Sequence, residues 1–203
     1  MLQNRVDPRG NIIAVTARGS WMGNRGVLHN DQQKIVRPYK LNAWITCVLE
    51  FRGRKREVMA PNRYTELFFL DEATAFAAGH RPCYECRRQD FERFKRCWLK
   101  GNPEYGFSES SSINEIDKIL HHQRIDSKGA KQTYEELGEN IPDGSFVEIL
   151  GKAYLVAGNH LFEWSAPGYG EGKMLPASTK FAVLTPESIV NAFRMGYHPQ
   201  MRL

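Results

Sequence analysis

Two of the four cysteines of this 203-residue chain are spaced as Cys83-Tyr-Glu-Cys86. A Cys-x-x-Cys turn brings two thiolates close enough to bind one metal ion, and Zn²⁺ favours such sulfur ligands in a tetrahedron. Thioredoxin-like redox sites use the same spacing, but there the cysteines open a helix directly after a strand. Here a short helical pattern, Gly79 and Pro82 precede the pair, which favours a metal-binding turn. Two reduced thiols in an ordinary turn are the alternative.

The segment around this pair, FFLDEATAFAAGHRPCYECRRQD (68–90), resembles the zinc-binding module of the Ada-type adaptive-response DNA repair proteins. In that family an aromatic pair, a short alanine-rich helix and an Arg-Pro-Cys-x-x-Cys-Arg segment supply half of a four-cysteine zinc site. A looser likeness covers residues 23–90, because related zinc modules open with a Gly-Asn…Tyr-His pattern and this chain has GNRGVLH at 23–29. The resemblance implies that Cys83 and Cys86 are zinc ligands.

Two further residues are candidates for completing the metal site. The family carries Cys-x-x-x-Cys upstream, whereas here Cys47 is followed four residues later by Phe51. Cys47 is the third ligand if its predicted strand lies beside the turn. A buried strand thiol is the alternative, since cysteine is among the most buried residue types. His29 is the natural fourth ligand, and Cys97 is a poor one because it lies far along the next predicted helix.

In the Ada-type repair proteins a zinc-bound thiolate accepts a methyl group from a phosphotriester in DNA. The resemblance therefore implies DNA as a partner and gives Cys47 an alternative role as a methyl acceptor. An imidazole ligand in place of a thiolate would leave the remaining sulfur atoms less nucleophilic, so we favour Cys47 as a ligand alone. A zinc ion that only stabilises the loop-rich first half is a further alternative, since structural zinc contributes folding energy.

Positive charge is concentrated in the first half of the chain. The net charge is +5, and residues 1–100 carry 19 lysines and arginines against 10 aspartates and glutamates. Such a distribution indicates an anionic partner, most commonly nucleic acid, here DNA or RNA. The candidate phosphate contacts are the basic residues of a predicted hairpin tip and those following the cysteine pair: Arg52, Arg54, Lys55, Arg56, Arg87 and Arg88. A solvated hairpin tip is the alternative.

The second half contains one candidate catalytic pair. Asp117 and His121 lie four residues apart on a predicted helix, and a carboxylate beside an imidazole can activate water. A base-excising or phosphodiester-cleaving enzyme with a purely structural zinc would use such a pair. A surface pair without catalytic function is the favoured interpretation. A protein-interaction module without nucleic-acid binding is the third class of function, and the sequence does not decide whether the chain is an enzyme.

The expected fold class is α+β, with an Ada-like zinc-binding N-terminal half (1–107) packed on a helix-plus-antiparallel-β-meander C-terminal half (108–203). The hydrophobic content of 41% and the charged content of 25% are ordinary for a globular protein. The local patterns predict strands at 42–51, 54–60, 64–70 and 181–184, helices at 72–78, 88–99, 112–124, 131–138 and 185–196, a meander over 141–164, and loops at 17–26 and 164–178.

No apolar run approaches the roughly 20 residues of a membrane helix. The N-terminal residues MLQNRVDPRGNII also lack the apolar core of a signal peptide. We therefore expect a cytoplasmic protein without a membrane partner. A reducing compartment disfavours disulfides, and four cysteines over this length are too few for a disulfide scaffold.

Overall fold

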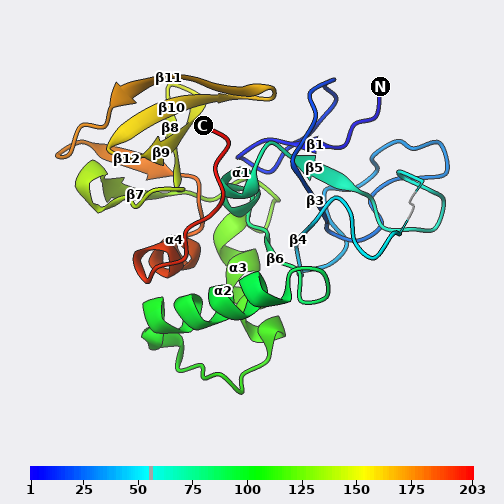
Figure 1. Cartoon of the computed structure of the whole chain (residues 1–203), viewed down its shortest axis with the longest axis horizontal. Helices are drawn as coiled ribbons and strands as arrows, with labels where there is room; N and C mark the ends of the chain where they lie inside the picture. The colour runs from blue at the N-terminus through cyan, green and yellow to red at the C-terminus, as the bar shows by residue number, and fades with distance from the viewer. Residues whose placement is uncertain (55–56) are drawn as a thin grey trace.

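The computed structural model describes residues 1–54 and 57–203 (Figure 1). The fold is α+β, with two six-stranded sheets on either side of a short central helix and longer helices packed beneath them. The elements are β1 (Arg5–Val6), β2 (Ile12–Ile13), β3 (Trp21–Asn24), β4 (Ile45–Cys47), β5 (Leu67–Phe69), α1 (Glu72–Ala77), β6 (Arg81–Pro82), α2 (Arg88–Gly101), η1 (Pro103–Tyr105), α3 (Ile113–Arg124), β7 (Tyr134–Leu137), η2 (Gly138–Asn140), β8 (Phe146–Ile149), β9 (Lys152–Ala157), β10 (His160–Ser165), β11 (Gly168–Met174), β12 (Lys180–Val183) and α4 (Glu187–Arg194).

The first sheet has the strand order β2-β1-β5-β3-β4-β6. Strand β3 pairs antiparallel with β4, so that Met22 lies opposite Cys47. Strand β4 then pairs parallel with β6, with Thr46 opposite Pro82. Because β6 leads directly into the Cys-x-x-Cys turn, this register places Cys47 beside Cys83.

Two predictions in this region were wrong. The predicted loop 17–26 contains β3, and strand β4 pairs with β3 and β6 rather than with a return strand at 54–60. The described residues of 54–60 form no strand and include a turn at 58–59, while Lys55 and Arg56 lie outside the described residues. The glycine content of 17–26 is what suggests a loop. At Gly23, however, an added Cβ would lie 2.3 Å from the Ile45 carbonyl oxygen, so the close strand pairing itself requires glycine.

Helices α1 and α3 begin at local capping signals, whereas α4 starts at Pro186 without a side-chain cap. Asp71 accepts a hydrogen bond from the Thr74 backbone N–H at 2.8 Å at the start of α1, and Gly79 follows its end with φ of 83°. Ser112 and Glu115 form a complete capping box at the start of α3. These signals depend only on neighbouring residues, which explains why the sequence reveals them.

The second sheet has the order β11-β10-β9-β8-β12-β7, and its β8–β9–β10 part confirms the predicted meander. The predicted helix at 131–138 is wrong, because this segment forms β7, which pairs with β12. The predicted loop 164–178 contains β11, which pairs with β10. The glycine-rich, exposed β11 takes its conformation from that pairing: a Cβ on Gly172 would lie 2.7 Å from the Phe162 ring, so the ring covers the glycine.

Helix α1 packs against both sheets, and every one of its residues is buried. Ala75 belongs to a hydrophobic cluster with Leu67 of the first sheet, and Ala73 belongs to one with Phe146 of the second. Phe76 joins a third cluster formed with side chains of α2, α3 and α4. The segments 1–107 and 108–203 thus pack on each other around α1. In the described part of the chain, no helix has the length and apolarity needed to cross a membrane.

Candidate metal centre

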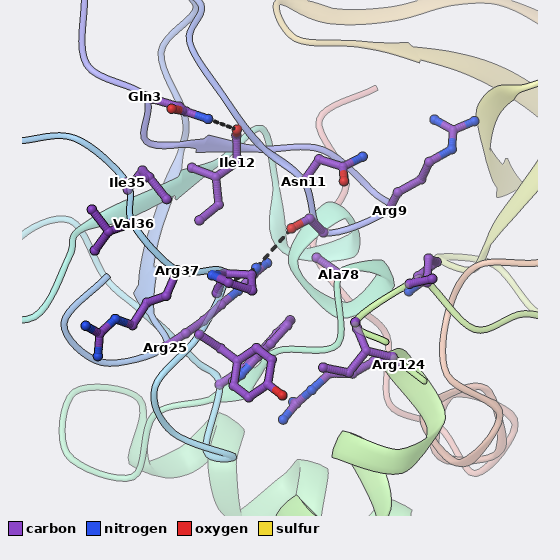
Figure 2. A pocket seen from close by; sticks show the side chains of 18 residues that line it. Gln3, Arg9, Asn11, Ile12, Arg25, Ile35, Val36, Arg37, Ala78 and Arg124 are labelled. Carbon is purple, nitrogen blue, oxygen red and sulfur yellow. Dashed lines mark hydrogen bonds between the residues drawn. The ribbon is translucent and has the colours of Figure 1, made fainter. Parts of the chain in front are cut away.

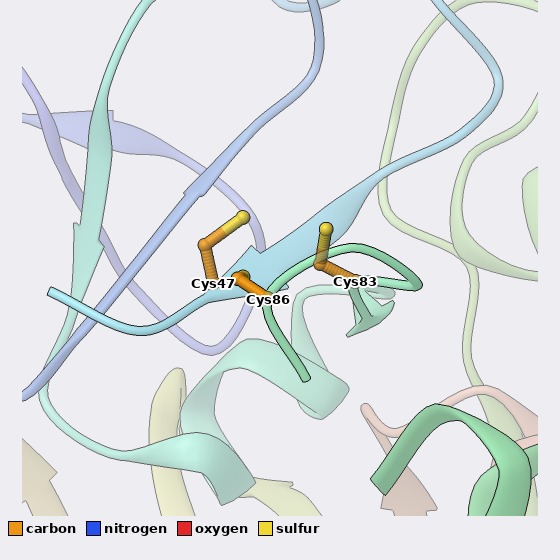
Figure 3. Close-up of side chains that lie close together, drawn as sticks. All are labelled: Cys47, Cys83 and Cys86. Atoms are coloured by element: carbon orange, nitrogen blue, oxygen red, sulfur yellow. The ribbon is translucent and has the colours of Figure 1, made fainter. Parts of the chain in front are cut away.

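Three cysteines from two separate segments meet at one end of the first sheet (Figure 3). The sulfur atoms of Cys47, Cys83 and Cys86 all lie within 4.8 Å of one another. Cys47 and Cys83 are each 7% exposed, whereas Cys86 is partly exposed. Met22 and Ile45 surround the thiols with apolar side chains. The predicted Cys-x-x-Cys pair and the predicted third cysteine therefore form one cluster.

Backbone hydrogen bonds position each cysteine. Cys47 ends β4, and the Cys83 N–H donates to the Thr46 carbonyl oxygen at 2.9 Å, which fixes the start of the turn against β4. The Arg87 N–H donates to the Cys83 carbonyl oxygen at 3.1 Å, so the turn closes on itself before α2 begins. The cluster is thus held by strand pairing on one side and by a helix start on the other.

The three thiols shift one another's pKa values. Hydrogen bonds from Cys47 and then from Cys86, together with the backbone N–H groups of Cys86 and Glu85, lower the pKa of Cys83. The same hydrogen bonds to Cys83 and Cys86, together with burial, raise the pKa of Cys47. One thiolate is therefore stabilised by two thiols, since like charges this close disfavour a second ionisation. A bound metal cation would remove this limit on ionisation, because a thiol that coordinates a metal is deprotonated.

This donor set fits a thiophilic metal ion. Zinc–sulfur bonds of about 2.3 Å in a tetrahedron separate the sulfur atoms by about 3.8 Å, which agrees with their clustering here. Among the residues that the structure describes, no fourth His, Cys, Asp or Glu atom joins the group. Cys97 remains apart, as expected, with its thiol donating to the Met195 carbonyl oxygen at 3.4 Å. The cluster thus offers three sulfur ligands within the described part of the chain.

His29, the predicted fourth ligand, lies elsewhere. Its ring is buried, with Nδ1 2.6 Å from the Thr65 hydroxyl and Nε2 3.2 Å from the Ala60 carbonyl oxygen. Both ring nitrogens are therefore occupied by hydrogen bonds. The structure does not bring His29 to the sulfur atoms, and its ring connects the segment 28–36 to the segment 60–65 instead.

The predicted hairpin-tip arginines are exposed. The Arg52 and Arg54 guanidinium groups lie 4.9 and 5.3 Å from the centre of the Phe51 ring. Arg54 also forms an exposed ion pair of 2.6 Å with Glu85, the residue inside the Cys-x-x-Cys turn. The described part of the tip therefore lies next to the cysteine cluster.

The two arginines after the cysteine pair differ in their surroundings. Arg88 is exposed and pairs with Glu92 at 2.8 Å. The Arg87 side chain is only 2% exposed and forms ion pairs with Glu72 and, at 2.9 Å, with Asp90. Arg87 is thus a buried cation that connects α2 to α1. A phosphate contact would require its guanidinium to face solvent, so the structure does not place Arg87 for the predicted contact.

The predicted catalytic pair is not formed. The Asp117 carboxylate is buried and accepts two hydrogen bonds from Arg81, at 2.7 and 2.6 Å. The His121 Nδ1 lies 2.9 Å from Arg124, and burial followed by the Arg124 charge lowers the pKa of His121 to about 4. Asp117 is therefore neither a surface residue nor free to activate water, because a buried carboxylate requires its cationic partner.

Comparisons of the chain with protein-family models, with curated proteins and with solved structures give no match. The likeness to the Ada-type module therefore stays a resemblance of the sequence. The structure itself adds residues that no sequence pattern indicated, namely a group of cations beyond the other end of β4: the buried Arg25 and Arg124 and the partly buried Lys131. Arg25 lies far from Arg124 and Lys131 in the chain, so no common spacing links the three, and only the unusual burial of two arginines marks the group.

Proposed function

We propose that this chain is a zinc protein that binds nucleic acid. The observation that carries the zinc part is the gathering of three sulfur atoms from β4 and the following Cys-x-x-Cys turn within 4.8 Å of one another. Zinc is the metal of choice for thiolate ligands in a tetrahedral site. The likeness of residues 68–90 to Ada-type zinc modules supports the same metal.

The ligand set suggests what the zinc ion does. A zinc ion held by Cys47, Cys83 and Cys86 would connect the end of β4 to the turn before α2, and it would stabilise the three-residue β4 and the two-residue β6. A site with three protein ligands also keeps a position for an exogenous ligand.

The proposal of nucleic-acid binding depends on the basic, aromatic surface around the cysteine cluster. Tyr84, inside the Cys-x-x-Cys turn, is 52% exposed, and the Arg88 guanidinium lies 4.6 Å from its ring centre. Arg52 and Arg54 pack in the same way on Phe51. Exposed aromatic rings beside arginines suit stacked bases and phosphates of single-stranded DNA or RNA.

The two enzymatic alternatives receive less support. A methyl acceptor must reach its substrate, but Cys47 is only 7% exposed. A base-excising or phosphodiester-cleaving activity through Asp117 is disfavoured by its ion pair with Arg81. We therefore assign Cys47 as a metal ligand and Asp117 as a structural residue.

The zinc proposal predicts about one zinc ion per purified chain. Cys83→Ser and Cys86→Ser should each lose the metal, because a serine hydroxyl is a poor zinc ligand. Cys97→Ser is the matched control and should keep it, since Cys97 lies outside the cluster. The measurement is elemental analysis of protein purified without chelator. Full zinc retention in a double mutant of Cys83 and Cys86 would contradict the proposal.

The nucleic-acid proposal predicts that a triple variant with alanine at Arg52, Arg54 and Arg88 binds single-stranded DNA more weakly. The slope of log affinity against log salt should become shallower by up to about 0.7 for each phosphate that the variant no longer neutralises, because fewer counterions are released. Fluorescence anisotropy at several salt concentrations measures both quantities.

The matched control removes three exposed lysines from the second half of the chain, Lys128, Lys173 and Lys180. It changes the net charge equally and should leave affinity nearly unchanged. Equal weakening in both triple variants would show only a general charge effect, and the proposed interface would then be wrong.

A further inference from the structure

A cavity of about 410 Å³ opens beside the first sheet, and its lining includes the buried Arg25 and Arg124 and the partly buried Lys131 (Figure 2). Arg25 follows β3, Arg124 ends α3, and Lys131 lies in the segment before β7. Figure 2 places the apolar side chains of Ile12, Ile35 and Val36 apart from Arg124, with the polar Gln3 and Asn11 near them. The cavity thus combines a cluster of cations with an apolar wall that has polar residues at its margin.

The two arginines are held rigidly. Each is 1% exposed, and the guanidinium carbons of Arg25 and Arg124 lie 3.7 and 4.0 Å from the ring centre of Trp44. Arg25 donates to the Gly10 carbonyl oxygen at 2.9 Å and contacts His80 Nε2 at 3.2 Å. These contacts fix the direction of both planar groups before any ligand binds.

Arg25, Arg124 and Lys131 all keep N–H donors that can bind a ligand. Arg25 Nη2 and Arg124 Nε are buried and have no hydrogen-bond partner among the described residues. The Lys131 ammonium donates to the Ala77 carbonyl oxygen, which leaves two of its three hydrogens. Buried polar groups in native proteins are almost always satisfied, so these donors point to a missing acceptor.

The positive charges of Arg25, Arg124 and Lys131 are also not neutralised by ion pairs in the described part of the chain. Within residues 1–54 and 57–203, none of these three cations forms an ion pair with a carboxylate. Asp7 is near enough to act on Arg25 and Lys131, but its carboxylate accepts hydrogen bonds from Asn11. Asp117 acts on Arg124 but is engaged by two hydrogen bonds from Arg81. Two buried arginines and a partly buried lysine near two engaged carboxylates are unfavourable unless an anion binds among them.

We infer that this cavity binds the phosphate group of a phosphomonoester of about the size of a mononucleotide. Arginine forks match phosphate oxygens, and a lysine adds a point charge. The apolar wall receives the organic part, and the volume is in the range of small-molecule sites. The phosphomonoester is either a free nucleotide or the terminal phosphate of a nucleic-acid strand. The inference is independent of the zinc site and of the surface around Tyr84.

The test measures binding of inorganic phosphate, adenosine 5′-monophosphate and adenosine by isothermal titration calorimetry. Phosphate and the monophosphate should bind, and adenosine should not. Lys131→Met should weaken binding of the monophosphate by about tenfold or more, since it removes a partly buried charge. Lys131 is chosen because replacing Arg25 or Arg124 risks unfolding the protein.

Lys128→Met is the matched control, because this exposed lysine lies three residues away in the same segment. It should change the affinity by no more than about twofold. Competition by a 5′-phosphorylated oligonucleotide, and not by its dephosphorylated form, would support a strand end as the source. Competition by neither oligonucleotide would support a free nucleotide. Equal affinity for adenosine and the monophosphate, no binding of either phosphate, or wild-type affinity in Lys131→Met would overturn the inference.

Discussion

At the scale of single residues, burial determines the charge of Lys131 near neutral pH. Burial first, and then repulsion from Arg25 and Arg124, lowers the pKa of Lys131 to about 7. Burial likewise keeps the pKa of His80 well below its usual value, so that this ring stays neutral in the same range. Lys131 is therefore the group in this cluster that loses its proton as the pH rises through 7.

Affinity for sulfate should consequently fall between about pH 6 and about pH 8. Sulfate keeps its charge over this range, so the change reports on the protein. The sign follows from the lowered pKa: the cation that attracts the anion is present below 7 and is lost above it. Lys131→Arg should flatten the profile, since a guanidinium stays protonated. An equally steep profile in Lys131→Arg would assign the titration to another group.

The residues of the metal cluster show how far a sequence indicates a site. Cys83 and Cys86 are linked by a local spacing, and Cys47 meets them because a strand carries it there. The predicted fourth ligand, His29, does not join them, because its ring is occupied by Thr65 and by the Ala60 backbone. Thr65 and Ala60 lie more than thirty positions after His29 in the chain, and no local sequence pattern predicts these contacts.

At the scale of elements, a buried ion pair connects α3 to β6. Asp117 of α3 and Arg81 of β6 have side chains that are 2% and 5% exposed. The pair lies directly before the metal-binding turn, since β6 ends at Pro82. Removing one partner of a fully buried pair leaves an uncompensated charge, which is far more costly than losing a surface pair.

Asp117→Asn should therefore lower the free energy of unfolding by about 3–5 kcal/mol. Urea denaturation followed by circular dichroism measures this change as a lower midpoint. Glu92→Gln, which removes an exposed pair with Arg88 on α2, is the matched control and should have no measurable effect. Similar midpoints for the two variants would show that the Arg81–Asp117 pair contributes no more than a surface contact.

The elements that the sequence indicated are those specified by neighbours in the chain. The caps of α1 and α3, at Asp71 and Ser112, are local hydrogen bonds. The strands β3, β7 and β11 were not predicted, because their hydrogen bonds come from distant partners. Glycine-rich segments resemble loops by composition, although here Gly23 and Gly172 allow a close strand and a covering ring.

At the scale of the whole molecule, the cysteine cluster and the cation-lined cavity lie at opposite ends of one three-stranded ladder. Strands β4 and β6 are parallel, and β3 runs antiparallel to β4. Trp44 precedes β4 and Cys47 ends it, which separates the two sites by about 10 Å of extended chain. A metal ion bound by the cysteines would thus restrict the motion of β4, whose other end carries Trp44 in the wall of the cavity.

Removing the metal should accordingly weaken binding at the cavity. Strands of two and three residues have little stability alone, so losing the sulfur–metal bonds should let the ladder fluctuate and raise the dissociation constant for adenosine 5′-monophosphate. Calorimetry before and after chelation, with zinc content measured in parallel, tests this. Restoring zinc should restore affinity, and Cys97→Ser should behave as wild type. By reciprocity of linked binding, the monophosphate should raise the equilibrium affinity for zinc, measured by competition with a chelator. Unchanged affinity in fully zinc-free protein would show that the two ends of the ladder are uncoupled.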